Sequence, residues 1–152
     1  MIIRAAAIII AVLATGCVDA LAPDVGPPLR AVCTDADSDP ATAVSYQRDL
    51  VDGIFRRADL DCVHCHTAAG DSPLGLFVGG LDLGSYAGLR QGGAQAGAAV
   101  VVPGRPCQSV LYRKVVPGPP FGGRMPLDGP PFLAAADVQL IVDWIAEGAR
   151  DN

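Results

Sequence analysis

The clearest alternation of hydrophobic and polar positions lies near the end of the chain, between residues 134 and 150. Four apolar residues there recur at the i, i+3, i+4, i+7 spacing of one helix face: Val138, Ile141, Val142 and Ile145. Asp137 falls in the first turn of this segment and Arg150 in its last, which suits the dipole of a helix. The pattern predicts an amphipathic helix over residues 134–150.

Three shorter helices are predicted before it. Ser45 can cap a helix whose apolar residues form one stripe: Leu50, Val51, Ile54 and Phe55. Residues 85–89 allow one helical turn, and Pro106 suits the first turn of a helix that runs to about Val115. Alternation typical of a strand is confined to residues 81–83.

Glycine and proline dominate the segments between these helices. Residues 69–80 contain four glycines and one proline, and residues 116–131 contain six prolines and four glycines. Proline fixes φ and glycine tolerates unusual φ, so the second segment can form a shaped, rigid loop between two helices. Several short helices joined by such loops predict a small all-α fold.

The N-terminal segment has a different character, which indicates export. Arg4 precedes an unbroken run of ten apolar residues, 5–14, and a membrane-spanning helix needs roughly 20. We therefore interpret residues 1–16 as a secretory signal peptide. Leu13-Ala14-Thr15-Gly16-Cys17 resembles a bacterial lipobox, in which Cys17 is lipidated and becomes the mature N-terminus. The alternative is a plain signal peptide cut nearby, with Cys17 as an ordinary thiol.

Residues 17–42 are rich in Pro, Asp and Ala without periodicity, so we expect a flexible tether there and a folded domain over residues 43–152. Loss of the signal peptide removes Arg4 and leaves 10 basic against 16 acidic residues, a net charge of −6. An acidic chain without a basic patch does not suit nucleic acid. Aromatic residues make up only 5% of the chain, so an aliphatic core leaves room for another large, flat apolar body.

The motif Cys62-Val63-His64-Cys65-His66 carries the most specific chemistry in the chain. Cys62 and Cys65 lie three residues apart, so one helical turn places both sulfurs where they can form thioethers with the two vinyl groups of haem. His66 follows directly and can bind the iron from that face. The motif occurs once, which predicts one covalently attached c-type haem.

Two other kinds of site use a cysteine pair with this spacing. A zinc site needs four ligands, and the remaining candidates, His64, Cys33 and Cys107, form no second pair in the sequence. A thioredoxin-type redox pair opens a helix after a buried strand, and no apolar strand precedes Cys62. Both alternatives fit the sequence less well than haem.

Six-coordinate iron needs a second axial ligand. His64 lies inside the attachment turn and cannot readily reach the opposite face of the haem. Met125 is the only methionine after Met1, and it lies in the Gly/Pro loop, whereas a methionine that fills a core usually lies on a helix stripe. We therefore predict His66 and Met125 as axial ligands, with a raised reduction potential. The alternative is a haem enzyme or small-ligand sensor with an open sixth site, although no free histidine serves its acid–base chemistry.

The order of these features resembles a class I cytochrome c domain over about residues 45–150. Within that family the chain is similar to domains of Planctomycete and myxobacterial lipoproteins, in which Pro-Gly and Ser-x-Leu-Tyr-x-Lys precede Met-Pro, as residues 103–104 and 109–114 do here. The resemblance implies that His66 and Met125 ligate iron and that the first and last helices cross at the haem edge, near Phe55 and Trp144. Five apolar residues could pack around the porphyrin: Leu76, Leu83, Leu89, Leu111 and Val115.

Export also bears on the remaining cysteines and on the expected role. In an oxidising compartment Cys33 and Cys107 can form a disulfide, the alternative being two separate thiols. We expect an electron carrier rather than an enzyme, anchored by its lipid in the cell envelope and facing the periplasm. Val18, in place of an Asp after Cys17, favours the outer membrane. The expected partner is a redox protein or another cytochrome.

Overall fold

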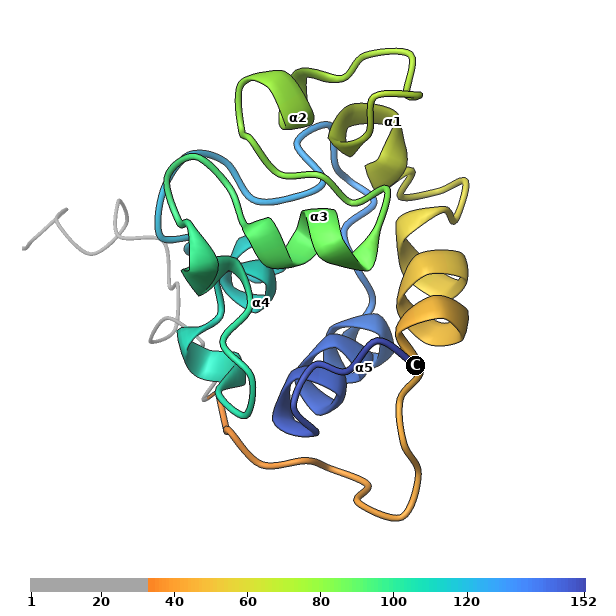
Figure 1. Ribbon diagram of the computed structural model, residues 1–152, viewed down its shortest axis with the longest axis vertical. Coiled ribbons are helices and arrows are strands. Elements are labelled where there is room, and N and C mark those ends of the chain that lie inside the picture. Colours follow the sequence, from red (N-terminus) through yellow and green to blue (C-terminus); the bar gives the residue numbers. More distant parts are fainter. Residues whose placement is uncertain (1–32) are drawn as a thin grey trace, which may run out of the picture. The chain divides into compact units, whose positions relative to one another are not determined.

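The computed structural model describes residues 33–152, which form one compact unit (Figure 1). The expected signal peptide, the lipidation site Cys17 and residues 17–32 of the expected tether lie outside the described residues. Within residues 33–152, no helix combines the length and the apolar character that crossing a membrane requires.

The described residues are helical and contain no strand, apart from an isolated bridge between Gly93 and Gly97. The elements follow in the order η1 (Tyr46–Phe55), α1 (Cys62–His66), α2 (Leu74–Phe77), α3 (Tyr86–Gln91), η2 (Ala98–Val100), η3 (Pro106–Gln108), α4 (Val110–Val115) and α5 (Ala135–Ala146). η1 is a π-helix, and η2 and η3 are short 3₁₀-helices. The predicted small all-α fold is confirmed.

η1 begins where the sequence predicts. The Ser45 Oγ accepts the N–H of Arg48 at 3.2 Å and so caps the first turn. The buried face contains all four residues of the predicted stripe together with Tyr46. This face packs against α5, and the two helices lie side by side in Figure 1.

α5 ends four residues earlier than the periodicity predicts, so Arg150 is not in its last turn. Gly148 and Ala149 both adopt positive φ, 103° and 52°, which a continuing helix does not allow. The N–H of Ala149 bonds to the Trp144 carbonyl at 2.9 Å, and the Trp144 Nε1 donates to the Arg150 carbonyl at 2.9 Å. The chain therefore turns back across the end of its own helix.

An aromatic cluster lies where η1, α3 and α5 meet. The ring centroids of Tyr46 and Trp144 are 5.5 Å apart, and those of Tyr46 and Tyr86 are 5.3 Å apart. Trp144 is completely buried and Phe55 nearly so. Because large rings bury much apolar area, these residues are the centre of the contact between the first and last helices.

Two predicted segments differ in detail from the structure. The helix expected from Pro106 to Val115 is divided into η3 and α4, because Ser109 is extended and its Oγ donates to the Arg105 carbonyl at 3.0 Å and accepts the N–H of Val102 at 2.9 Å. Residues 69–80, expected to be mostly loop, contain the one-turn helix α2.

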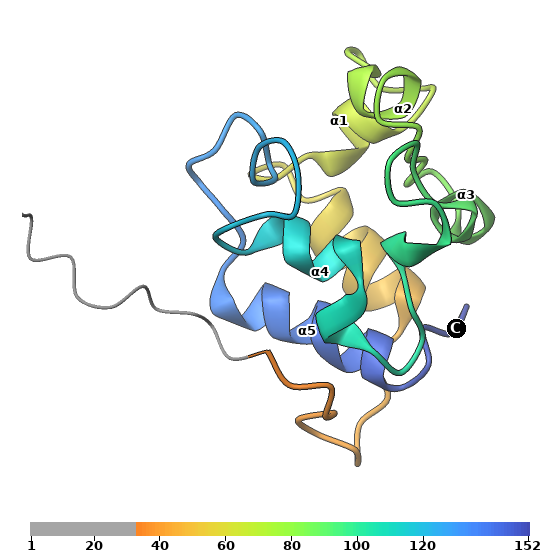
Figure 2. The ribbon, with the colours of Figure 1, turned by 90° about the vertical axis from the view of Figure 1, so that its left-hand side faces the viewer.

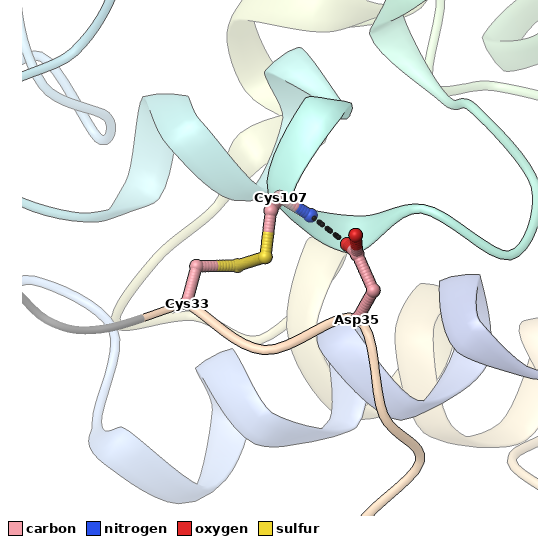
Figure 3. Close-up of side chains that lie close together, drawn as sticks. All are labelled: Cys33, Asp35 and Cys107. Atoms are coloured by element: carbon pink, nitrogen blue, oxygen red, sulfur yellow. Dashed lines mark hydrogen bonds between the residues drawn. A yellow bond between two sulfur atoms is a disulfide. The ribbon is translucent and has the colours of Figure 1, made fainter.

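The segment before η1 is attached to the folded unit. Cys33 and Cys107 form a disulfide, and the N–H of Cys107 donates to the Asp35 carboxylate at 2.8 Å (Figure 3). The backbone N–H and hydroxyl of Ser38 both donate to Asp143 of α5, at 2.8 and 2.6 Å. Part of the expected tether is therefore bonded to the folded unit, which spans Cys33–Asn152.

Candidate functional site

The C-x-x-C-H motif forms the whole of α1, and a tight turn leads into it. The chain after η1 closes with a bond from the Asp61 N–H to the Arg57 carbonyl at 2.7 Å, and Asp61 adopts positive φ, 36°. Aspartate tolerates this region better than most residues. Cys62 and Cys65 follow on one helical turn as free thiols, both half-buried. Two thiols so placed are available for attachment to one cofactor.

An ion pair fixes the residues just before the motif. Arg57 donates from two guanidinium nitrogens to the Asp137 carboxylate, at 2.8 and 2.7 Å, and from Nε to Asp59 at 2.7 Å. Asp137 also accepts the N–H of Ala134 at 3.2 Å. The bridge joins the end of η1 to the start of α5. The sequence shows Asp137 only as a helix-start residue and gives no sign of its partner.

His66 is oriented by two groups that the sequence does not reveal. Its Nδ1 lies 3.2 Å from the Leu81 carbonyl, which can only accept, so in the neutral imidazole Nδ1–H is the donor and Nε2 is left unprotonated. A Cβ on Gly75 would lie 2.6–2.7 Å from three atoms of the imidazole ring. Burial lowers the pKa of His66, with the Leu81 bond opposing and Lys114 adding to the shift. A neutral imidazole with a free Nε2 is the form that binds a metal.

Cys62 and His64, also on α1, differ from His66 in their surroundings. Burial raises the pKa of the Cys62 thiol to about 11, so the thiol is neutral. The sulfur would also be neutral in a thioether with a cofactor. His64 Nδ1 is 3.9 Å from the Asp71 carboxylate, and both residues line an open cavity of about 410 Å³. Neither Cys62 nor His66 lines that cavity. The two histidines of α1 therefore lie in different surroundings, and only His64 faces the open cavity.

Met125 lies in the loop between α4 and α5, which reaches the same end of the unit as α1 and α2 in both views (Figures 1 and 2). Its side chain is half-buried and packs against the hydrophobic core, as Cys62 and Val63 do. Its N–H donates to the carbonyl of Lys114, in the last turn of α4, at 2.8 Å. As the sequence predicts, this loop contains no regular element.

Exposed apolar side chains flank the motif on α2 and on the Met125 loop. Leu74, Phe77 and Val78 are 64–75% exposed, and Leu127 is 72% exposed. Side chains of this kind gain free energy when a large apolar body covers them. Together with the two thiols and the free Nε2, they fit a covalent haem.

Most of the residues expected to surround a porphyrin belong to the core against which Cys62 and Met125 pack. Leu83, Leu89, Leu111 and Val115 are buried in the protein's own core, and Leu76 is half-buried. The exposed apolar residues next to the motif were not identified from the sequence, because their periodicity is hidden in a glycine-rich segment.

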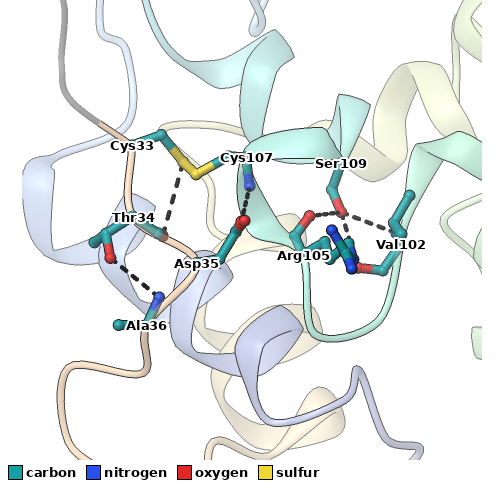
Figure 4. The surroundings of a disulfide bond; sticks show 8 residues. All are labelled: Cys33, Thr34, Asp35, Ala36, Val102, Arg105, Cys107 and Ser109. Carbon is teal, nitrogen blue, oxygen red and sulfur yellow. Dashed lines mark hydrogen bonds between the residues drawn. A yellow bond between two sulfur atoms is a disulfide. The ribbon is translucent and has the colours of Figure 1, made fainter.

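Cys33, Asp35 and Cys107 form a second group of potential metal ligands, with their ligand atoms within 4.8 Å of one another. The two sulfurs are bonded to each other, so they offer no thiolate to an ion. Figure 4 shows the same disulfide beside the Ser109 turn, where the Ser109 hydroxyl connects Arg105 and Val102. These three residues therefore join the segment around Cys33 to η3.

Fold and motif together define a small helical protein with the C-x-x-C-H pattern that is typical of covalent haem sites. Residues 62–126 match the family model described as Planctomycete cytochrome C, which supports a cytochrome c-type domain. The matched segment begins at Cys62 and includes Met125, while η1 and α5 lie outside it. No curated protein and no solved structure matches the chain. Over residues 62–126, the match supports the cytochrome c resemblance inferred from the sequence.

Proposed function

We propose that this protein is an exported monohaem c-type cytochrome that carries electrons between larger redox proteins. The observation that carries the proposal is α1 itself: one turn that presents two free thiols and a histidine whose Nδ1 is occupied by the Leu81 carbonyl. Cys62 and Cys65 would hold the haem, and Nε2 of His66 would bind its iron. A bound haem supplies a reversible one-electron couple.

Met125 is the proposed second axial ligand. It is half-buried, packs against the core that Cys62 also contacts, and its backbone is bonded to α4. A thioether is a neutral, soft ligand that favours ferrous iron, so the pair His66 and Met125 would give a comparatively high reduction potential. A closed sixth site suits electron transfer rather than catalysis at the iron.

The proposed setting follows from the N-terminal sequence. A lipid on Cys17 would hold the domain at the periplasmic face of the outer membrane, with residues after it as a spacer. Net charge of the mature chain is −6 after loss of Arg4, so a partner with a positively charged docking face would associate faster at low salt. The proposed partner class is a redox protein or another cytochrome.

The haem and its ligands can be tested in cells that carry out c-type haem attachment. We expect the purified protein to gain the mass of one haem and to be reduced and reoxidised reversibly. Cys62→Ala/Cys65→Ala should lose the covalent haem, whereas the matched pair Cys33→Ala/Cys107→Ala should keep it.

The sixth ligand is tested separately. Met125→Ala should keep the haem but lose the methionine-to-iron charge-transfer band and lower the potential. An unchanged spectrum would exclude Met125 as a ligand, and a wild-type protein without reversible reduction would exclude electron transfer.

A further inference from the structure

The last turn of α4 is bonded to the Met125 loop at several points. The carbonyl of Lys114 accepts the N–H of Met125 at 2.8 Å, and the carbonyl of Val115 accepts the Arg124 Nε at 2.8 Å. Carbonyls at the end of a helix have no partner within it. Here the loop supplies those partners, so α4 fixes the backbone on which Met125 sits.

The Lys114 side chain holds a second part of the same loop. Its Nζ donates to the carbonyls of Phe121 and Gly123, at 2.8 and 2.5 Å, and lies 5.1 Å from the centre of the Phe121 ring. Gly122, between the two carbonyls, has φ of 55° and lies close enough that an added Cβ would be 3.6 Å from Nζ. The loop thus bends around the ammonium group.

Apart from the Arg124 guanidinium, which lies 4.1 Å from the centre of the Phe132 ring, the loop has few other interactions that hold its shape. Six of residues 116–131 are prolines and donate no hydrogen bond. The one backbone bond within the loop joins the Gly129 N–H to the Pro126 carbonyl, beyond Met125. The segment from 116 to 125 therefore depends on α4, and above all on Lys114, which contacts it through both backbone and side chain.

We propose that Lys114 is the positioning residue for Met125: its ammonium gathers the Phe121 and Gly123 carbonyls and so holds the Met125 sulfur at the haem iron. The inference rests on the proposed His66 and Met125 ligation and adds a residue to it. Lys114 acts through the loop and does not itself bind the iron.

The test measures how easily an added ligand displaces Met125. Ferric, haem-loaded protein is titrated with imidazole, and the methionine-to-iron charge-transfer band is followed. Lys114→Ala removes the side-chain bonds but keeps the backbone bond, and alanine does not weaken a helix. We expect imidazole to bind about tenfold more tightly or more, which corresponds to about 1.4 kcal/mol, with a weaker charge-transfer band before imidazole is added.

Arg113→Ala is the matched control. Arg113 is the neighbouring residue of α4 and is exposed, and its side chain makes no hydrogen bond or ion pair within the described residues. Its loss removes the same charge from nearly the same place, so imidazole affinity should stay within twofold of wild type. An equal effect of both variants would mean that charge alone acts, which overturns the proposal.

The outcomes separate this inference from the function it rests on. A wild-type protein without the charge-transfer band would refute Met125 ligation itself. A wild type with the band, and Lys114→Ala with wild-type imidazole affinity, would refute only the role of Lys114. If Lys114→Ala does not load haem, Lys114→Gln is used, for which at least threefold tighter binding is expected and wild-type affinity overturns the proposal.

Discussion

Gly75 packs closely against the imidazole ring of His66 in the motif. The backbone of Gly75 does not have a positive φ. Glycine is required there for lack of space, because a Cβ on Gly75 would lie within 2.7 Å of three imidazole atoms. Either α2 or the imidazole would have to move to admit a methyl group. The sequence identified His66 but not this neighbour, since nothing in a local pattern shows which glycine a ring will pack against.

Gly75→Ala should therefore destabilise the haem-loaded protein by about 1–3 kcal/mol, as overpacking does in other cores, and should alter the histidine–iron signature. Denaturant unfolding and absorption spectra provide the measurements. Gly53→Ala is the control, because its Cβ would lie 3.3 Å from the nearest atom, the Arg48 carbonyl, and alanine favours a helix. Equal stability of Gly75→Ala and wild type would show that the ring has room.

Among the elements, η1 and α5 followed most closely from the sequence. Their apolar residues repeat at helical spacing over ten or more residues, a signal that depends on no distant contact. The sequence does not predict α2, because its one turn lies among glycines and packs against α1. Short helices made by tertiary contacts leave no periodicity to detect.

The junction of η1 and α5 should be sensitive to acid. The Arg57 hydrogen bonds hold the pKa of Asp137 below its usual value, with burial opposing. A carboxyl whose pKa is lower in the folded than in the unfolded state stabilises the folded state. The full contribution is present at pH values above the unfolded pKa of about 3.9, and it is lost as the pH falls through the folded pKa. Below about pH 4 the bridge should therefore weaken.

Asp137→Asn should cost about 1–3 kcal/mol at pH 7, because it leaves the Arg57 fork without its charged acceptor. It should also flatten the acid side of the stability profile, measured by urea unfolding between pH 2 and 7. The control is Arg56→Ala, which breaks an exposed ion pair with Asp52 at 3.0 Å and should change stability by less than about 0.5 kcal/mol. Parallel acid profiles for Asp137→Asn and wild type would contradict the assignment.

At the scale of the whole molecule, the N-terminal segment adds a covalent link across the fold. The Cys33–Cys107 disulfide spans 74 residues of sequence, and a loop of that size should stabilise the folded state by about 4 kcal/mol through the unfolded chain. Cys33→Ser/Cys107→Ser should lower the free energy of unfolding by up to that amount. Haem attachment and the absorption spectrum should not change, since neither cysteine lies in α1. Loss of the charge-transfer band in the double variant would show that the haem site depends on the disulfide.

Composition indicated a tether from residue 17 to 42, but composition does not report contacts made in space. Asp35 and Ser38 belong to that polar segment, and each is bonded to a residue more than seventy positions away. Their partners, Cys107 and Asp143, lie on η3 and α5. Such pairs are visible only once the helices are in place.

The position of this disulfide also bears on how the protein is assembled. Cys33 is the first and Cys107 the last of the four cysteines in residues 33–152, with Cys62 and Cys65 between them. Four cysteines allow three pairings, and two of these join a motif cysteine to an outer one. If the chain is exported as proposed, pairing in order of emergence would join Cys33 to Cys62 first. Attachment of haem removes both inner thiols from this competition, so a cofactor bound early would also direct the oxidation of the outer pair.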